Sequence, residues 1–154
     1  MLLYKKIIKK LLKKNITISV AESCTGGLLS STLTSESGIS KIFNMGLITY
    51  SNKAKTNLLQ ISQNHLKNYG AVSHKTAALM AQNLKKISKS KLCISTTGIA
   101  GPLGGTKMKS PGLVFIGIIY KNKIIVLEKK FQGTRIQIQQ KTVKSIFVTL
   151  EKLI

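Results

Sequence analysis

Carboxylates are scarce in this sequence of 154 residues, which contains no aspartate and only four glutamates. The glutamates lie far apart, at Glu22, Glu36, Glu128 and Glu151. Hard cations such as Mg²⁺ bind clustered oxygen ligands, and glycoside hydrolysis needs a pair of carboxyl groups. The spacing indicates neither arrangement, and we therefore expect a protein without a metal ion or another cofactor.

Cysteine and long apolar runs are also scarce. Cys24 and Cys93 are the two cysteines, and they form no Cys-x-x-Cys motif or cysteine–histidine cluster. They provide neither a disulfide framework nor a zinc site, so both thiols should be reduced. No stretch approaches the roughly 20 apolar residues of a membrane-spanning helix, and lysine pairs interrupt the N-terminal segment where a signal peptide would be apolar. We expect a soluble, cytoplasmic protein without a membrane partner.

Positive charge dominates the residues that are present. The 25 lysines and arginines give a formal net charge of +21, which favours a polyanionic partner. All of these cations except Arg135 are lysines, and they are scattered along the whole chain. Aromatic residues make up only 5%, so side chains that stack on bases are few. An AT-rich coding bias fits this composition at least as well, and we expect nucleic-acid binding to be at most weak and non-specific.

Hydrophobic periodicity predicts alternating helices and strands. The predicted helices cover residues 2–13, 28–35, 61–70, 74–88 and 134–153, and the predicted strands cover residues 16–20, 43–51, 91–98, 113–120 and 124–131. The residues Lys121-Asn122-Lys123 between the last two strands indicate an antiparallel hairpin. Residues 1–154 are enough for one domain. We therefore expect a single three-layer α/β/α domain with a mixed, largely parallel sheet.

Two glycine-rich segments follow predicted strands. They are "AESCTGG" at residues 21–27 and "TTGIAGPLGGT" at residues 96–106. In sheets of this class, ligands bind beyond the carboxyl ends of the strands. A glycine-rich turn before a helix exposes backbone N–H groups that suit a phosphate or an oxyanion. Either loop alone is also consistent with glycines that only permit a tight turn.

The first of these loops contains two candidate nucleophiles, Ser23 and Cys24, and the spacing alone favours neither. His65 and His74 fall in predicted helices, where an ordinary surface or packing role is the more typical one. A lysine with a lowered pKa can act as the base instead. The segment "ITYSNKAK" offers Tyr50, Lys53 and Lys55 immediately after a predicted strand.

Five segments in this order resemble the C-terminal domain of the CinA proteins, the nicotinamide-nucleotide amidohydrolases. They are "AESCTGG", "GLITYSNKAK", "YGAVS", "TGIAGPLGGT" and "FQGTR". The resemblance extends from about Ile16 to the final predicted helix. It implies hydrolysis of the carboxamide of nicotinamide mononucleotide to nicotinate mononucleotide and ammonia, a step in pyridine nucleotide salvage. Larger CinA proteins carry an additional nucleotide-cleaving domain, which we expect this chain to lack.

The resemblance also implies roles for individual residues. Ser23, rather than Cys24, would attack the amide carbon, Lys55 would be the base, and Tyr50 would relay the proton or orient the other two groups. The substrate-binding residues that it implies are Thr25, Gly26, Gly27, Gly101, Gly104, Gly105, Thr106 and Arg135. One glycine loop would bind the oxyanion and the other the nucleotide phosphate, in an order that the sequence leaves open.

Three departures from the family pattern bear on phosphate affinity and on the choice of substrate. Thr134 replaces the usual aspartate, Gln139 replaces a second arginine, and "KSPG" at residues 109–112 replaces "KPVG". The alternative function is a non-catalytic nucleotide- or DNA-binding module associated with competence. Retention of all three catalytic residues favours the enzyme, which could act as a homo-oligomer on a small nucleotide substrate.

Overall fold

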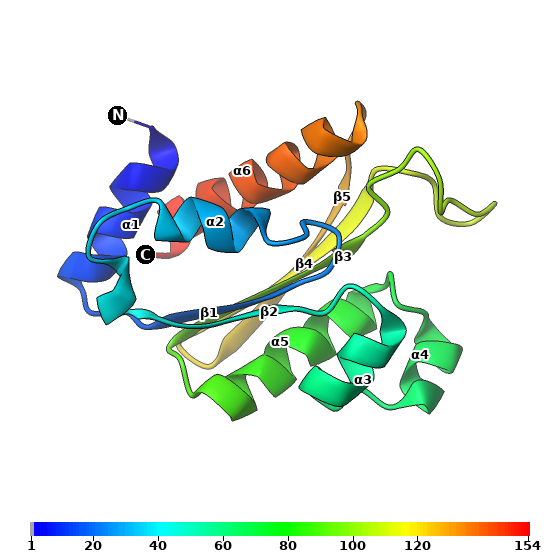
Figure 1. Cartoon of the computed structure of the whole chain (residues 1–154), viewed down its shortest axis with the longest axis horizontal. Helices are drawn as coiled ribbons and strands as arrows, with labels where there is room; N and C mark the ends of the chain where they lie inside the picture. The colour runs from blue at the N-terminus through cyan, green and yellow to red at the C-terminus, as the bar shows by residue number, and fades with distance from the viewer. Residues whose placement is uncertain (1) are drawn as a thin grey trace.

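In the computed structural model, which describes residues 2–154, helices cover both faces of a central five-stranded sheet (Figure 1). The strands are β1 (Ile18–Glu22), β2 (Phe43–Ile48), β3 (Leu92–Gly98), β4 (Leu113–Tyr120) and β5 (Lys123–Lys130). Their order in the sheet is β2-β1-β3-β4-β5. The first three strands in this order are mutually parallel, and β4 and β5 pair antiparallel. The predicted three-layer α/β/α class with a mixed sheet is confirmed.

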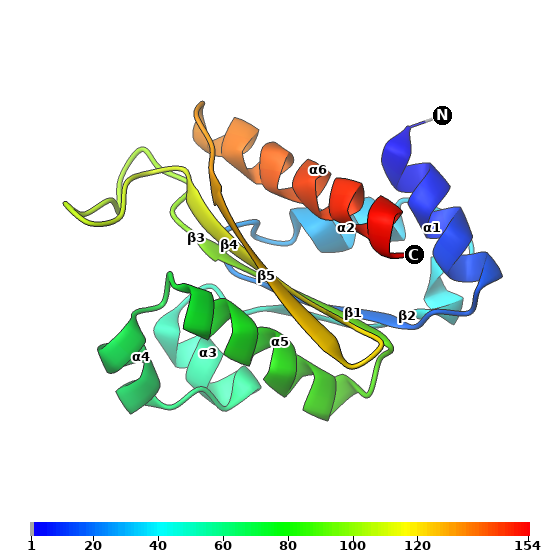
Figure 2. The same ribbon diagram turned by 180° about the vertical axis from the view of Figure 1, so that it is seen from behind.

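The helices form two layers, one on each face of the sheet, and both layers can be followed in the views from the front and from behind (Figures 1 and 2). One layer contains α1 (Leu3–Lys13), α2 (Leu28–Thr34) and α6 (Arg135–Leu153), and the other contains α3 (Asn52–Leu59), α4 (Gln63–Tyr69) and α5 (His74–Ser88). A short 3₁₀ helix, η1 (Ile39–Lys41), precedes β2. Within residues 2–154, none of these helices combines the length and apolar character that crossing a bilayer requires.

The core lies on both faces of the sheet, because the central strands are covered by both helical layers. All residues of β1 are buried, as are all residues of β3 except its last, which is half-buried. Continuous burial of this kind is typical of parallel strands in α/β proteins. The carboxyl ends of β1 and β3 are therefore held by the core, and the loops that follow them emerge at the same edge of the sheet.

Most predicted elements are confirmed, with α5 and β4 at the predicted residues and the hairpin turn at Lys121 and Asn122. Both of these turn residues have positive φ, as a two-residue hairpin turn requires. The first strand lies two residues later than expected, at Ile18–Glu22, and β2 ends earlier, at Ile48. The prediction missed α3 altogether. This helix begins after Ser51, whose hydroxyl accepts a hydrogen bond from the Ala54 amide at 3.0 Å.

Candidate active site

A cavity of about 280 Å³ lies at the carboxyl ends of β1 and β3. Its walls come from the turn after β1, the start of α3, the loop after β3 and the first residue of α6. The polar side chains that line it are Ser23, Tyr50, Asn52, Lys55, Thr97 and Arg135. The structure thus brings together the serine, tyrosine, lysine and arginine singled out in the sequence.

Ser23 and Lys55 contact each other directly inside this cavity. The Lys55 Nζ lies 3.0 Å from the Ser23 Oγ and 2.9 Å from the backbone oxygen of Thr49, to which it donates. Both side chains are buried, with 6% of Ser23 and 2% of Lys55 exposed. No carboxylate in the part of the chain that the structure describes pairs with this amine. Burial lowers the pKa of Lys55, because the charged form loses its hydration.

Cys24, the other candidate nucleophile, is in a different electrostatic state. Burial raises the pKa of its thiol to about 12, so the thiol stays protonated at neutral pH. The Lys55 amine is hydrogen-bonded to the neighbouring Ser23 hydroxyl instead. The geometry therefore favours Ser23 as the nucleophile and leaves Cys24 as a packed neighbour.

The turn that carries Ser23 is held by a chain of hydrogen bonds to β3. The Ser23 amide donates to the backbone oxygen of Thr96 at 3.0 Å. The Thr25 hydroxyl donates to Glu22 Oε2 at 2.6 Å and lies 2.8 Å from the Thr96 hydroxyl. Thr25 is only 2% exposed, and its hydroxyl is engaged by Glu22 and Thr96, so its side chain positions the turn. The expectation that Thr25 binds substrate stays a prediction, for which its backbone amide rather than its side chain is available.

Glu22 occupies the N-terminus of α2. Its fully buried carboxylate accepts hydrogen bonds from the amides of Gly27 at 3.1 Å and Ser30 at 2.7 Å, and from the Ser30 hydroxyl at 2.7 Å. The Gly26 amide donates to the backbone oxygen of Ser23 at 3.0 Å. The two glycines have φ values of +57° and +99°, which a turn of this kind requires. Both glycine amides thus have intramolecular acceptors, and the binding of substrate by Gly26 and Gly27 stays a prediction.

The amides of Cys24 and Thr25 are the backbone donors of this turn that remain available. Within residues 2–154 neither donates a hydrogen bond to another residue. The Gln139 side chain of α6 donates through Nε2 to the backbone oxygen of Cys24 at 2.9 Å. In a trans peptide the N–H points away from the C=O, so this bond also fixes the direction of the Thr25 N–H. No signal in the sequence indicates this role of Gln139.

Tyr50 also lines the cavity, and its hydroxyl is hydrogen-bonded to Arg135 rather than to Ser23 or Lys55. The tyrosine is 55% exposed, and its hydroxyl accepts a hydrogen bond from the Arg135 guanidinium. The same guanidinium donates to the backbone oxygen of Gly101 at 2.8 Å. In the described residues Tyr50 makes no hydrogen bond to Ser23 or Lys55, which contact each other without it. The predicted proton relay through Tyr50 is absent from this geometry.

The glycine-rich loop after β3 contributes only its first part to the cavity. Gly104 lines the cavity, and Gly101 binds Arg135 through its carbonyl. Gly105 and Thr106 are exposed and lie outside the lining. Thr106 instead closes a turn with Lys109, its amide donating to the Lys109 oxygen at 2.7 Å and its hydroxyl accepting from the Lys109 amide at 3.1 Å. The substrate-binding prediction for Gly105 and Thr106 is therefore not supported.

Thr134, one of the departures from the family pattern, has a clear structural role. Its hydroxyl accepts from the Gln137 amide at 3.3 Å, and the Gln137 side chain accepts from the Thr134 amide at 2.8 Å. These two bonds form a capping box at the start of α6. Threonine and aspartate are both good N-cap residues, so the exchange preserves the helix start that positions Arg135.

The remaining titratable candidates lie outside the cavity lining. His65 Nε2 lies 3.0 Å from the Thr76 hydroxyl, and His74 is the first residue of α5. Cys93 is buried and, like Cys24, is a free thiol. Among residues 2–154 no group of histidine, cysteine and glutamate side chains has the arrangement of a metal site.

Comparison with known proteins gives consistent matches. The family model of the CinA C-terminal domain matches residues 2–154. A competence-damage inducible protein of Thermoanaerobacter pseudethanolicus is 47% identical over 137 residues, which are 89% of this chain and 33% of that protein. A protein of the same description from Clostridium novyi is 50% identical over 135 residues, 88% of this chain and 33% of its own length. The chain thus spans about a third of these curated relatives.

A solved structure extends this similarity to the fold. The competence/damage inducible protein CihA of Agrobacterium tumefaciens superimposes with a TM-score of 0.93 at 35% sequence identity, covering 98% of this chain and 93% of that one. Because the family model also accounts for all described residues, the chain belongs to the CinA family, as a CinA C-terminal domain.

Proposed function

We propose that this domain is an amidase that hydrolyses the carboxamide of nicotinamide mononucleotide, with Ser23 as nucleophile and Lys55 as general base. The observation that carries the proposal is the 3.0 Å contact between a buried serine hydroxyl and a buried lysine amine that has no carboxylate partner among residues 2–154. Serine is a weak nucleophile at its ordinary pKa, and an adjacent base activates it. The substrate follows from the resemblance of the motifs.

Acylation begins with Lys55 in its neutral form. Because the amine donates one N–H to the Thr49 oxygen, its lone pair can be directed at the Ser23 hydroxyl, which donates its proton as Oγ attacks the amide carbon. A tetrahedral intermediate forms. Its oxygen carries the negative charge that the unoccupied amides of Cys24 and Thr25 are suited to stabilise.

Collapse of the intermediate breaks the carbon–nitrogen bond. The protonated Lys55 returns its proton to the departing nitrogen, which leaves as ammonia and gives an ester on Ser23. Water then attacks the ester carbon while Lys55 takes a proton from it, and the second collapse releases the carboxylate and restores the Ser23 hydroxyl. Acyl transfer of this kind needs no oxidant or reductant, and its protons are shuttled by the one amine.

Arg135 is suited to bind the phosphate of the nucleotide. Two nitrogens of its guanidinium already donate, one to the Tyr50 hydroxyl and one to the Gly101 oxygen, and these bonds fix the plane of the guanidinium in the cavity lining. A guanidinium has five N–H donors, so others remain for a ligand. Tyr50 then orients the arginine rather than the nucleophile.

Incubation of the protein with nicotinamide mononucleotide tests the proposal. We expect release of ammonia together with nicotinate mononucleotide, and in an acid-quenched sample a mass increase on the peptide that contains Ser23. Nicotinamide riboside, which lacks the phosphate, should have a much higher KM. Activity should persist in a chelator, because serine acylation does not require a metal ion.

The Ser23→Ala variant is the matched control, since it removes one oxygen from a buried site without changing charge. Absence of ammonia release from every pyridine amide, with the fold intact by circular dichroism, would overturn the amidase proposal. If ammonia is released from the riboside with the same KM as from the mononucleotide, the amidase proposal stands, but Arg135 does not bind the phosphate.

A further inference from the structure

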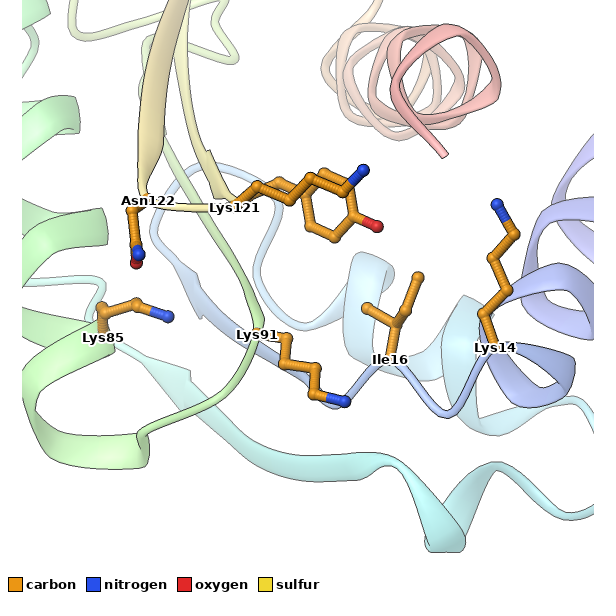
Figure 3. Close-up of a pocket in the computed structure, with 7 residues that line it drawn as sticks. Lys14, Ile16, Lys85, Lys91, Lys121 and Asn122 are labelled. Carbon is orange, nitrogen blue, oxygen red and sulfur yellow. The ribbon is translucent and has the colours of Figure 1, made fainter.

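A second cavity, of about 500 Å³, lies at the opposite end of the sheet from Ser23. It is formed where β1 and β3 begin and where β4 turns into β5. Four lysines from separate segments surround it, as Figure 3 shows, and we call it the lysine pocket. They are Lys14 after α1, Lys85 in the last turn of α5, Lys91 before β3 and Lys121 in the hairpin turn.

Three of these amines are held in place by backbone oxygens. Lys85 donates to the oxygen of Ser90 at 2.9 Å, and Lys91 donates to the oxygen of Asn15 at 3.1 Å. Lys14 donates to the oxygen of Ile154 at 2.6 Å. Each ammonium group has three N–H donors, so each keeps two for a ligand. Their positions are thereby fixed without loss of their positive charge.

The fourth amine lies beside an aromatic ring. The Lys121 Nζ is 5.4 Å from the centroid of the Tyr120 ring, and Tyr120 also lines the pocket. Lysine and tyrosine at this separation make a cation–π contact. The pocket therefore offers a flat aromatic surface next to its cations.

No glutamate side chain of the described residues pairs with these four lysines. Among residues 2–154, the pocket has no glutamate in its lining, and both ion pairs of the described chain are made by other lysines, Lys5 with Glu36 and Lys6 with Glu151. Four positive groups around one hollow repel one another and create a local potential that attracts a multiply charged anion. The candidate active site differs, because Lys55 is buried there and the exposed cation in its lining is Arg135.

We infer that the lysine pocket binds the polyphosphate group of a small ligand. Its volume suits such a group, and four cations from four segments can contact oxygens on several phosphates at once. A nucleic acid is less well matched, since the cations surround one hollow instead of following a track, and Tyr120 is the single aromatic residue of the lining. This inference is independent of the amidase proposal.

Calorimetry and thermal unfolding with inorganic tripolyphosphate test the inference at fixed ionic strength. We expect saturable binding and an increase in Tm of about 3–5 °C at a concentration near ten times Kd. The double variant Lys85→Gln, Lys91→Gln should bind at least about tenfold more weakly, since it loses two charge-assisted contacts. Adenosine triphosphate and adenosine are measured in parallel to identify the source of the polyphosphate group. Tighter binding of adenosine triphosphate than of tripolyphosphate would indicate a nucleotide, and equal binding would indicate a free polyphosphate.

The matched control is the double variant Lys41→Gln, Lys130→Gln, which removes the same net charge from exposed lysines outside the pocket. Equal weakening in both double variants would assign binding to net charge and overturn the inference. Loss of binding in Arg135→Gln, with retention in the pocket variant, would place the anion in the candidate active site and overturn it too. Tighter binding of a short single-stranded oligonucleotide, weakened equally in both double variants, would favour a nucleic acid instead.

Discussion

The two ends of the sheet use lysine in opposite ways. At the carboxyl ends of β1 and β3, Lys55 is 2% exposed, and its pKa is lowered by burial. At the other end, Lys14, Lys91 and Lys121 are exposed and Lys85 is half-buried around an open hollow. At neither end do these lysines form an ion pair with a glutamate of the described residues. The first environment favours a neutral amine that accepts a proton, and the second favours charged amines that attract an anion.

This comparison shows that burial, rather than residue type or local sequence, decides what a lysine does in this protein. Both groups of amines donate to backbone oxygens at similar distances, 2.9 Å for Lys55 to Thr49 and 2.9 Å for Lys85 to Ser90. What differs is the neighbouring hydroxyl of Ser23 and the loss of water around Lys55. In a chain with 25 lysines and arginines, a lysine suited to act as a base is therefore distinguished by its environment.

The largest effect is expected from breaking the buried dyad. Ser23→Ala should lower kcat for the amide by more than about 10³-fold, and Lys55→Met by about 10²–10⁴-fold. Methionine is chosen because it approximates the lysine volume, whereas arginine would bury a permanent charge. Ammonia release by purified variants measures the effect.

Two controls sharpen this prediction. Cys24→Ala should retain most of the activity, since its thiol is protonated and only packs. Lys55→Ala should be partly rescued by small alkylamines that enter the vacated space and act as the base. Undiminished activity in Lys55→Met would show that Lys55 is not the base. Inactivity of a folded Cys24→Ala variant would indicate that Cys24 is the nucleophile instead of Ser23.

The second prediction concerns the pH dependence of the reaction at the Lys55 end of the sheet. If Lys55 is the base, kcat/KM should rise about tenfold per pH unit and level off at the lowered pKa of Lys55, below the ordinary value of about 10.4. A pH–rate profile tests this prediction, and a flat profile across the range would remove Lys55 as the base.

Stability gives an independent measure of the same pKa. Between the lowered folded-state pKa of Lys55 and about 10.4, the unfolded chain binds more protons than the folded one, so the free energy of unfolding rises with pH through this window. Lys55→Met should lack this contribution. Denaturant unfolding of both proteins at several pH values tests it, and parallel curves would mean that the pKa of Lys55 is not lowered.

Local patterns were sufficient to predict most of the fold. The helix α5 follows from a Ser73 cap and a long apolar period, and the β4–β5 hairpin follows from two apolar strands around a short turn. The helix α3 was missed because it is short and polar, with two buried residues, Lys55 and Leu59. Its Ser51 cap was the one local signal that could have indicated it.

The candidate site was predictable as far as its motifs extend. The motifs singled out Ser23, Lys55 and Arg135, which all line the cavity. They could not show that the Glu22 carboxylate accepts hydrogen bonds from the Gly27 and Ser30 amides. That contact depends on how β1 directs its last side chain against α2. Gln139 reaches Cys24 from 115 residues away in the chain, and only the packing of α6 brings the two together.

The third prediction tests Gln139 as a positioning residue at the active-site end. Gln139→Ala should lower kcat by about 10-fold to 10²-fold with little change in KM, because the Cys24–Thr25 peptide loses its anchor and the oxyanion donors lose orientation. Gln139→Arg, which keeps an N–H donor, should retain more activity. A rise in KM without a change in kcat would instead indicate that Gln139 contacts the substrate.

The smallest effect is expected at the lysine pocket in the absence of any ligand. Lys85→Gln, Lys91→Gln should raise the Tm by about 1–3 °C at low ionic strength, since it relieves repulsion among amines that form no ion pair with a glutamate of the described residues. The increase should vanish in about 0.5 M salt, where exposed charges are screened within a few ångströms. Lys41→Gln, Lys130→Gln should show a smaller change. A lower Tm at every salt concentration would mean that the hydrogen bonds to the Ser90 and Asn15 oxygens stabilise the fold more than the charges destabilise it.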